Sequence, residues 1–327
     1  MEILARVGLG EGSLAFPHPP TVCLRSDGSV LCVAAQEMES GPGLALVHVT
    51  ASGETARVPL PDGAFGAQPV IVDRGADGVV VLVDDVTAVL TGGGLNSAET
   101  VGIAGREVVS GHGSRLTVGG IARPADDGSW LMVLSDPTSF QNARTIARLS
   151  VVDGAPAWDE AAMLHGKEFP MAGGRTSTAL GGAKAPIVGD VIEVAGTRYA
   201  AAQGSDTMSL LKYGSDFFTL AELDGDGHVV RRLYEESGWK KMPGKHGIRA
   251  RFASDGTAAI LTPVFRSGDW KGRQRLVDLR DGSSAVVPAV RGAAGFALVD
   301  LRGDIVLLAS GSEVLLVRGL VETAPRG

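Results

Sequence analysis

Cysteine and aromatic residues are scarce in this chain of 327 residues. Its two cysteines are too few for the disulfide framework of a small secreted domain. Aromatic side chains make up 5% of the residues, so a hydrophobic core has to be built from Val, Leu, Ile and Ala. No run approaches the ~20 apolar residues of a membrane-spanning helix, and the N-terminus lacks a basic segment followed by an apolar stretch. These absences predict a soluble, cytoplasmic protein with no membrane partner.

Short metal-ligand and nucleophile patterns are also missing. The six histidines are scattered, no Gly-x-Ser-x-Gly motif occurs, and neither cysteine has a histidine nearby in sequence. We therefore expect no metal and no cofactor. The formal net charge of -7 disfavours nucleic acid as a partner. The oligomeric state is left open by the sequence.

Glycine, in contrast, is abundant, and much of it lies in tight turns. The 46 glycines are about twice the average share of ~7%. Each turn lies between short runs rich in Val, Leu and Ile, and Asp-Gly tolerates the positive φ that a two-residue hairpin requires. Each turn therefore predicts one antiparallel pair. The Asp-Gly or Gly-Asp pairs are at residues 27–28, 77–78, 127–128, 255–256 and 303–304, with a weaker Ala-Gly pair at 195–196.

Four-strand units can be read outward from these turns. In the third unit, residues 156–164 are either a strand or a short helix, because Pro156 followed by Asp159 and Glu160 is a helix-opening pattern. The last unit has three clear strands, at 296–301, 305–310 and 313–318. The first unit predicts strands at 21–24, 29–35, 44–49 and 55–60; the next four units span 69–104, 116–164, 187–234 and 248–288.

A missing fourth strand in the last unit would leave an unpaired edge, which promotes aggregation. Residues 2–7 form an orphan strand that would fill this place and close the ring, with residues 321–323 as the competing candidate. The anchor glycines of successive units are 50, 50, 68, 60 and 47 residues apart, near the ~40–50 residues of known four-stranded blades. The sequence thus predicts an all-β, six-bladed β-propeller of four-stranded antiparallel blades, one domain over residues 1–327, with five or seven blades as the alternative count.

The two cysteines flank the first turn. If Asp27-Gly28 is a two-residue turn, Ser26 lies opposite Ser29 and Cys23 lies opposite Cys32. Cross-strand α-carbons ~4.5–5.5 Å apart are within reach of a disulfide. The alternative is two reduced cysteines packed as small hydrophobic side chains.

The turn pattern resembles the broad β-propeller superfold, and the blade style is similar to sialidase-like propellers. The resemblance is carried by Leu24-Arg25-Ser26-Asp27-Gly28-Ser29-Val30 and its repeats. The nearest counterpart of the Asp box of those propellers is Ala125-Asp126-Asp127-Gly128-Ser129-Trp130, which is one residue short and stands at a turn between first and second strands. The arginine cluster and the Tyr-Glu pair that this resemblance implies are not recognisable in the sequence, so no catalytic residue is transferred from it.

Connections at the two ends of the strands differ in predicted length. Turns between first and second and between third and fourth strands are short, whereas the second-to-third connections and those between units are long. Loops longer than their structural role requires commonly carry binding and catalysis. We therefore expect the functional site at the elaborated end of the ring. The long connections are predicted at residues 36–43, 136–144, 165–186, 204–216, 235–247 and 264–274.

Basic residues gather in the fifth-blade region. The segment from Arg231 to Arg280 holds twelve Lys or Arg and five acidic residues, a net charge of +7 that leaves -14 for the remainder of the chain. Basic loops with tryptophans predict a site in which cations neutralise an anion and indole rings stack on it. Nearby cations would lower the pKa of His or Tyr and suit them to proton transfer. The predicted ligand-binding residues are Trp239, Lys240, Lys241, Lys245, Arg266, Trp270, Lys271 and Arg144, and the predicted catalytic residues are His165, His246 and Tyr213.

These features support two functions from different classes. The first is binding of an anionic small molecule or sugar acid, with hydrolase or lyase action on it. The alternative is a non-catalytic platform for an acidic peptide or protein partner. An enzyme requires a deep pocket with a proton-transfer group, whereas a platform requires a broad, shallow surface. Solvated loop cations, with tryptophans sealing grooves between blades, would serve neither function.

Overall fold

The computed structural model describes most strands of the chain and the turns between them. The described residues are 2–8, 22–39, 41–61, 69–92, 94–95, 97–105, 117–135, 144–163, 170–171, 175–176, 184–205, 215–224, 229–240, 248–263, 273–288, 295–310 and 313–319.

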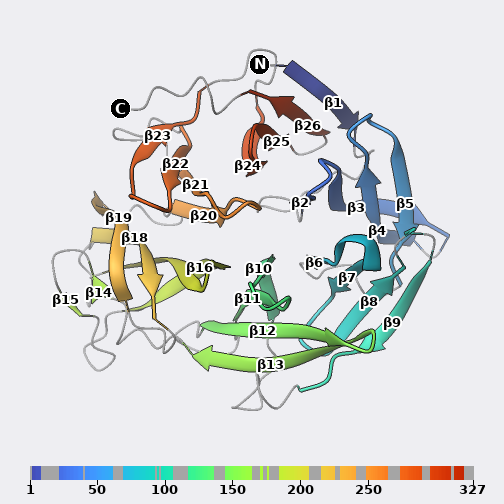
Figure 1. The fold of residues 1–327 in the computed structure, drawn as a ribbon, viewed down its shortest axis with the longest axis horizontal. Helices are drawn as coiled ribbons and strands as arrows, with labels where there is room; N and C mark the ends of the chain where they lie inside the picture. Colours follow the sequence, from blue (N-terminus) through green and yellow to red (C-terminus); the bar gives the residue numbers. More distant parts are fainter. Residues whose placement is uncertain are drawn as a thin grey trace.

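Six four-stranded antiparallel sheets stand around a common axis, as blades of a propeller (Figure 1). Blade 1 comprises β2 (Val22–Leu24), β3 (Val30–Met38), β4 (Gly41–Val49) and β5 (Thr55–Pro59); blade 2 comprises β6 (Val70–Asp73), β7 (Val79–Leu82), β8 (Thr87–Thr91) and β9 (Ala98–Gly102), with the 3-10 turn η1 (Gly75–Asp77); and blade 3 comprises β10 (Thr117–Pro124), β11 (Trp130–Ser135), β12 (Arg144–Val152) and β13 (Ala155–Met163).

The second half of the ring has the same plan. Blade 4 comprises β16 (Lys184–Val194), β17 (Thr197–Ser205), β18 (Ser215–Leu223) and β19 (Val229–Lys240); blade 5 comprises β20 (Ile248–Phe252), β21 (Ala258–Pro263), β22 (Arg275–Asp278) and β23 (Ser284–Val286); and blade 6 comprises β24 (Ala297–Arg302), β25 (Ile305–Ala309), β26 (Glu313–Arg318) and β1 (Glu2–Gly8). A separate two-stranded sheet pairs β14 (Pro170–Met171) with β15 (Arg175–Thr176).

The innermost strand of each blade contacts the innermost strands of both neighbouring blades, in the order β2, β6, β10, β16, β20, β24 and back to β2. These contacts confirm the predicted ring of six blades. An apolar strand inside a blade packs against neighbouring blades on both of its faces, so its sequence is a continuous run of apolar residues. β7, Val79-Val80-Val81-Leu82, is buried at all four positions.

The N-terminal strand closes the ring, as predicted. β1 pairs antiparallel with β26 as the outermost strand of blade 6. The Arg6 guanidinium donates to both carboxylate oxygens of Glu313, at 3.1 and 2.8 Å, and lies 5.7 Å from the centroid of the Phe296 ring. The competing candidate, residues 321–323, lies outside the described residues.

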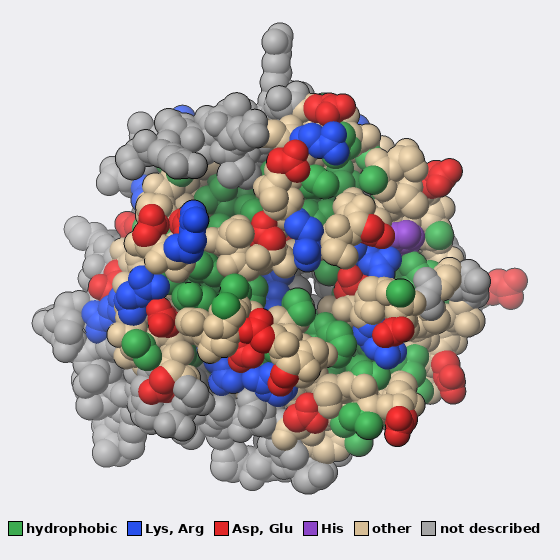
Figure 2. Space-filling view, viewed as in Figure 1, with side chains coloured by type: hydrophobic (Ala, Val, Ile, Leu, Met, Phe, Trp, Pro, Cys, Tyr) green, Lys and Arg blue, Asp and Glu red, His purple; other side chains and the backbone are tan. Residues whose placement is uncertain are grey.

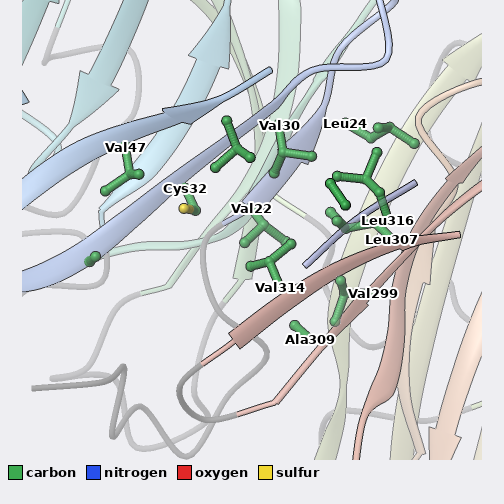
Figure 3. Packing of buried hydrophobic residues seen from close by; sticks show 13 residues of the cluster. Val22, Leu24, Val30, Cys32, Val47, Val299, Leu307, Ala309, Val314 and Leu316 are labelled. Carbon is green, nitrogen blue, oxygen red and sulfur yellow. The ribbon is translucent and has the colours of Figure 1, made fainter. Parts of the chain in front are cut away.

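A hydrophobic cluster fills each of the six interfaces between neighbouring blades. At the closure, side chains of β2, β3 and β4 pack against those of β24, β25 and β26, with Val22, Val30 and Leu316 at their centre (Figure 3). Small aliphatic side chains allow the sheets to approach closely, which the low aromatic content had predicted.

The first turn differs from its prediction. Arg25 N donates to Ser29 O at 2.9 Å, and Gly28 N donates to Arg25 O at 3.1 Å with Gly28 at a φ of 80°, so the loop has three residues and not two. An odd loop shifts the register by one residue, and Cys23 pairs with Leu31 while Cys32 pairs with Val22.

The predicted cross-strand cysteine pair is therefore wrong. Successive strand positions face opposite sides of a sheet, so Cys32 packs between blades 6 and 1 and Cys23 packs toward blade 2. Both thiols are free, and burial raises the pKa of each to about 12.

Two further details correct the sequence reading. Residues 155–163 form the strand β13, not a helix, because they pair along their length with β12. The predicted long loop at 36–43 is a tight hairpin, since β3 and β4 remain paired as far as Met38 and Gly41. Within the described residues, no helix is long and apolar enough to cross a membrane.

Candidate functional site

The two ends of the ring carry connections of different length. At the smooth end, turns between first and second and between third and fourth strands hold at most six residues. At the other end, second-to-third connections are long only in three adjacent blades, at residues 136–143, 206–214 and 264–274 of blades 3, 4 and 5. The connection from blade 3 to blade 4 runs from 164 to 183 at the same end. The elaborated end is thus defined by blades 3 to 5.

Three of the predicted site residues lie on strand ends that face this elaborated end. Trp239 and Lys240 finish β19, paired with Asp216 and Ser215 of β18. Arg144 begins β12, opposite Ser135. The other predicted residues lie outside the described part of the chain, and their convergence stays a prediction. These residues are Lys241, Lys245, Arg266, Trp270, Lys271, His165, His246 and Tyr213.

A cluster of buried charges that the sequence reading missed lies at the ring axis. We call it the axial cluster: Arg123 of β10, Asp190 of β16, Arg251 of β20 and Asp300 of β24. The signs alternate around blades 3 to 6, and each of the four residues is at most 5% exposed. Residues of non-adjacent blades meet here, because Arg251 of blade 5 donates to the carbonyl of Val22 in blade 1.

The two carboxylates of the axial cluster hold neighbouring blades together. Asp300 accepts from the backbone N–H of Leu24 in blade 1 at 3.2 Å and of Ser254 in blade 5 at 2.9 Å. It also accepts from its neighbour Leu301 at 2.8 Å and from the Ser254 hydroxyl. One side chain therefore joins three blades through buried hydrogen bonds.

Asp190 plays a similar part between blades 3, 4 and 5. It accepts from the backbone N–H of Val191 and of Phe252, both at 2.9 Å, and from Arg123 Nη2 at 3.4 Å. Burial raises the pKa of Asp190, while Arg123 and these N–H donors oppose the shift. Burial lowers the pKa of Arg251 to about 10. This value is still well above neutral pH, so the guanidinium remains charged.

A sequence signal for the axial cluster exists. Cys23, Arg123 and Arg251 each stand five residues before the glycine of an Asp-Gly-Ser or Asp-Gly-Thr turn, in blades 1, 3 and 5. Pairwise strand reading does not connect these three blades, and only closure of the ring brings them to one axis. Cys23 is part of this neighbourhood, because Asp300, Asp73, Arg123 and Arg251 all act on its pKa after burial, which is the largest cause.

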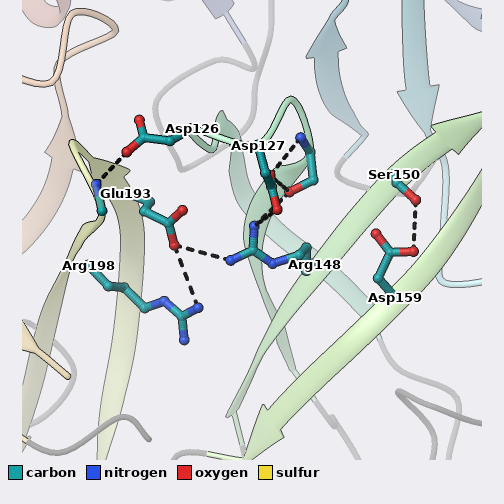
Figure 4. Close-up of polar contacts among 9 residues, drawn as sticks. Asp126, Asp127, Arg148, Ser150, Asp159, Glu193 and Arg198 are labelled. Atoms are coloured by element: carbon teal, nitrogen blue, oxygen red, sulfur yellow. Dashed lines mark hydrogen bonds and ion pairs between the residues drawn. The ribbon is translucent and has the colours of Figure 1, made fainter. Parts of the chain in front are cut away.

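A chain of exposed and half-buried ion pairs crosses from blade 3 to blade 4 (Figure 4). Arg148 pairs with Asp127 at 2.8 Å and with Glu193 at 3.1 Å, and Arg198 lies 3.7 Å from Glu193. Asp126 accepts from the backbone N–H of Gly196. One face of the ring mixes both signs of charge in this way and is hollowed at its centre, where basic side chains border the opening (Figure 2). The described charges of this chain are thus paired with charges of opposite sign.

A Tyr-Glu pair with an arginine, which the sequence alone had not revealed, lies between blades 4 and 5. Tyr234 Oη donates to Glu236 at 2.6 Å and accepts from Arg275 Nη1 at 3.1 Å. Burial raises the pKa of Tyr234, so its hydroxyl stays protonated. Because Tyr234 is on β19, the outermost strand of its blade, we interpret the group as an inter-blade contact and not as a catalytic nucleophile.

The lowered pKa of His48 leads us to expect that the stability of the fold depends on pH. Burial, and then the charge of Arg25, lower its pKa against the opposing effects of Asp27 and Asp73. Its Nε2 is buried and has no hydrogen-bond partner in the part of the chain that the structure describes. The unfolded chain therefore binds this proton more readily, and stability falls as pH drops below the ordinary histidine value of ~6.5. Urea unfolding at about pH 7.5 and about pH 5.5 should show a smaller difference in His48→Gln than in the unchanged protein; equal differences would contradict this.

Comparison with known proteins identifies similar folds but no protein family. No protein family and no curated protein matches the sequence. Among solved structures, the polysaccharide lyase Uly1 shares 10% identity at a TM-score of 0.52, over 93% of this chain and 90% of its own. An α-L-arabinanase from Penicillium chrysogenum, complexed with arabinobiose, shares 12% identity at a TM-score of 0.53, over 98% of this chain and 99% of its own. At such identities the likeness shows the shared propeller architecture.

Proposed function

We propose that this propeller binds an anionic carbohydrate at its elaborated end and cleaves it as a lyase or hydrolase. The observation that carries the proposal is that, among the described strands, the second-to-third connections are long only in blades 3, 4 and 5, and that the basic segment from Arg231 to Arg280 runs through blades 4 and 5. Strand β19 ends there in Trp239 and Lys240. Two structures that match more than nine-tenths of this chain, a polysaccharide lyase and an arabinanase, support a carbohydrate substrate.

Of the two reactions, we favour the lyase. A hydrolase of the usual kind needs two available carboxylates flanking the glycosidic bond. The described axial carboxylates, Asp190 and Asp300, instead accept several buried hydrogen bonds from neighbouring blades. A lyase needs a cation to neutralise the uronic acid carboxylate, a base and an acid. The basic segment and the predicted catalytic residues His165, His246 and Tyr213 supply these residue types.

The elimination would proceed at a uronic acid unit. Lys240 and its basic neighbours would neutralise the carboxylate, which acidifies the adjacent C5–H. One of His165, His246 and Tyr213 would remove that proton while the C4–O bond breaks. The C5–H electron pair becomes the C4=C5 double bond, and a second member of this set would protonate the leaving oxygen. The tryptophans would stack on the sugar rings.

The test is incubation with neutral and acidic polysaccharides, with two readouts. A lyase raises the ultraviolet absorbance of the unsaturated product, and a hydrolase produces reducing ends without that absorbance. We expect the first signal with a polyuronate and none with neutral polymers. Absence of both signals on every polymer, together with binding of an acidic peptide, would replace the enzyme with an interaction platform.

A further inference from the structure

The axial cluster buries two guanidinium groups that are linked through Asp190, which accepts from Arg123 Nη2 and from the backbone N–H of Phe252, the residue after Arg251. The Arg123 and Arg251 side chains are 2% and 5% exposed, and the charge of Arg123 acts on the pKa of Arg251, after burial and Asp300. Removing a guanidinium from water is costly unless its charge is paired and its five N–H donors are satisfied. Whether the axis can bind an anion therefore depends on which acceptors already satisfy these guanidinium donors.

The neighbouring carboxylates are largely occupied by other donors. Asp300 receives three backbone N–H groups and one hydroxyl. Asp190 receives two backbone N–H groups, and its oxygen approaches Arg123 Nη2 only to 3.4 Å. Asp73, the carboxylate of blade 2, forms an ion pair with Arg25. Much of the negative charge at the axis is thus directed to backbone donors.

Arg123 keeps an unsatisfied donor. Its Nε is fully buried and has no hydrogen-bond partner among the described residues. On blade 1, the position that corresponds to Arg123 and Arg251 is Cys23, a neutral thiol that adds no negative charge. A buried donor without a partner costs about 1–3 kcal/mol, so an acceptor at this point would be bound favourably.

We propose that a single halide-sized anion binds on the ring axis beside Arg123, between the Arg123 and Arg251 guanidinium groups. We choose the smallest class of anion because the four residues of the axial cluster are each at most 5% exposed. The ring is hollowed at its centre (Figure 2). Such an anion accepts from Arg123 Nε and screens the repulsion between the two arginines. It links blades 3 and 5 across the axis and is independent of the carbohydrate reaction proposed above.

The first test measures the melting temperature after exchange into a buffer whose only anion is gluconate. Chloride or bromide, added at constant ionic strength, should raise it saturably by roughly 2–4 °C or more. Arg123→Met should lose this response. Arg148→Met, on the same blade but in the exposed ion-pair chain, should retain it. A melting temperature that does not depend on halide, or an equal response in the two variants, would overturn the proposal.

Arg123→Met is at risk of not folding, so a second measurement uses the unchanged protein. Crystals soaked in bromide should give one anomalous-scattering peak within hydrogen-bonding distance of Arg123. A peak shown to be water, present without anomalous signal, would mean that a solvent molecule satisfies the Nε donor and that no anion site exists. Either result leaves the polysaccharide assay unaffected, so the two proposals fail separately.

Discussion

Replacing Asp300 with alanine is expected to lower the free energy of unfolding by about 3–5 kcal/mol. The substitution removes the acceptor of buried N–H groups from Leu24, Ser254 and Leu301, in blades 1, 5 and 6. It also removes the carboxylate whose charge most favours the ionised form of Arg251, and leaves the weaker effect of Asp190. Urea denaturation, followed by circular dichroism, measures the change.

Asp304→Ala is the matched control. Asp304 is in the next turn of the same blade, exposed, with a 3.5 Å ion pair to Arg318, so its loss should change stability by less than about 0.5 kcal/mol. If Asp300→Ala fails to fold, Asp300→Asn keeps one acceptor oxygen and should show an intermediate loss. Equal stability of the Asp300 and Asp304 variants would mean that the axial carboxylate does not hold the blades together.

Blade number and ring closure were predictable because both follow from local patterns. Turn residues such as Asp127-Gly128 mark hairpins within a few residues, and a strand without a partner at 2–7 had one unfilled edge to pair with. The first hairpin shows the limit of this reasoning. Asp27-Gly28 fits a two-residue or a three-residue loop, and that one-residue difference separates Cys23 from Cys32.

The axial cluster was not predicted because it depends on closure of the whole ring. Arg251 lies far from Val22 in sequence and two blades away in the ring, yet the two residues share a hydrogen bond. A strand-by-strand reading interprets an arginine next to Phe252 as a solvated side chain. The elaborated end could be located from connection lengths, but the directions of its loop side chains depend on contacts between loops that no spacing in the sequence encodes.

Reversing the charge of Lys240 and Lys241 together is expected to weaken binding of an acidic oligosaccharide by on the order of 100-fold. Two cations that each contact a carboxylate contribute about 1.5–3 kcal/mol apiece, so the pair contributes about 3 kcal/mol at the lower end, and ~2.7 kcal/mol corresponds to a factor of about 100. Lys240 is the last residue of β19 and pairs with Ser215 of β18 through the backbone. Replacing its side chain by glutamate therefore leaves this strand pairing in place. Calorimetric titration of an oligouronate into the folded variant measures the change.

The control makes the same charge change elsewhere in the basic segment. Arg231 lies near the start of β19, at the opposite end of the strand from Lys240. Arg280 lies in the turn after β22, and its backbone carbonyl accepts a hydrogen bond from Arg231 Nη1. Reversing both arginines alters net charge by the same amount, so any general electrostatic attraction falls equally in the two double variants. Affinity lost only in the lysine variant places the anion at the elaborated end. Equal losses would show that the oligouronate responds to overall charge, and the basic strand end of blade 4 would then have no special part in binding.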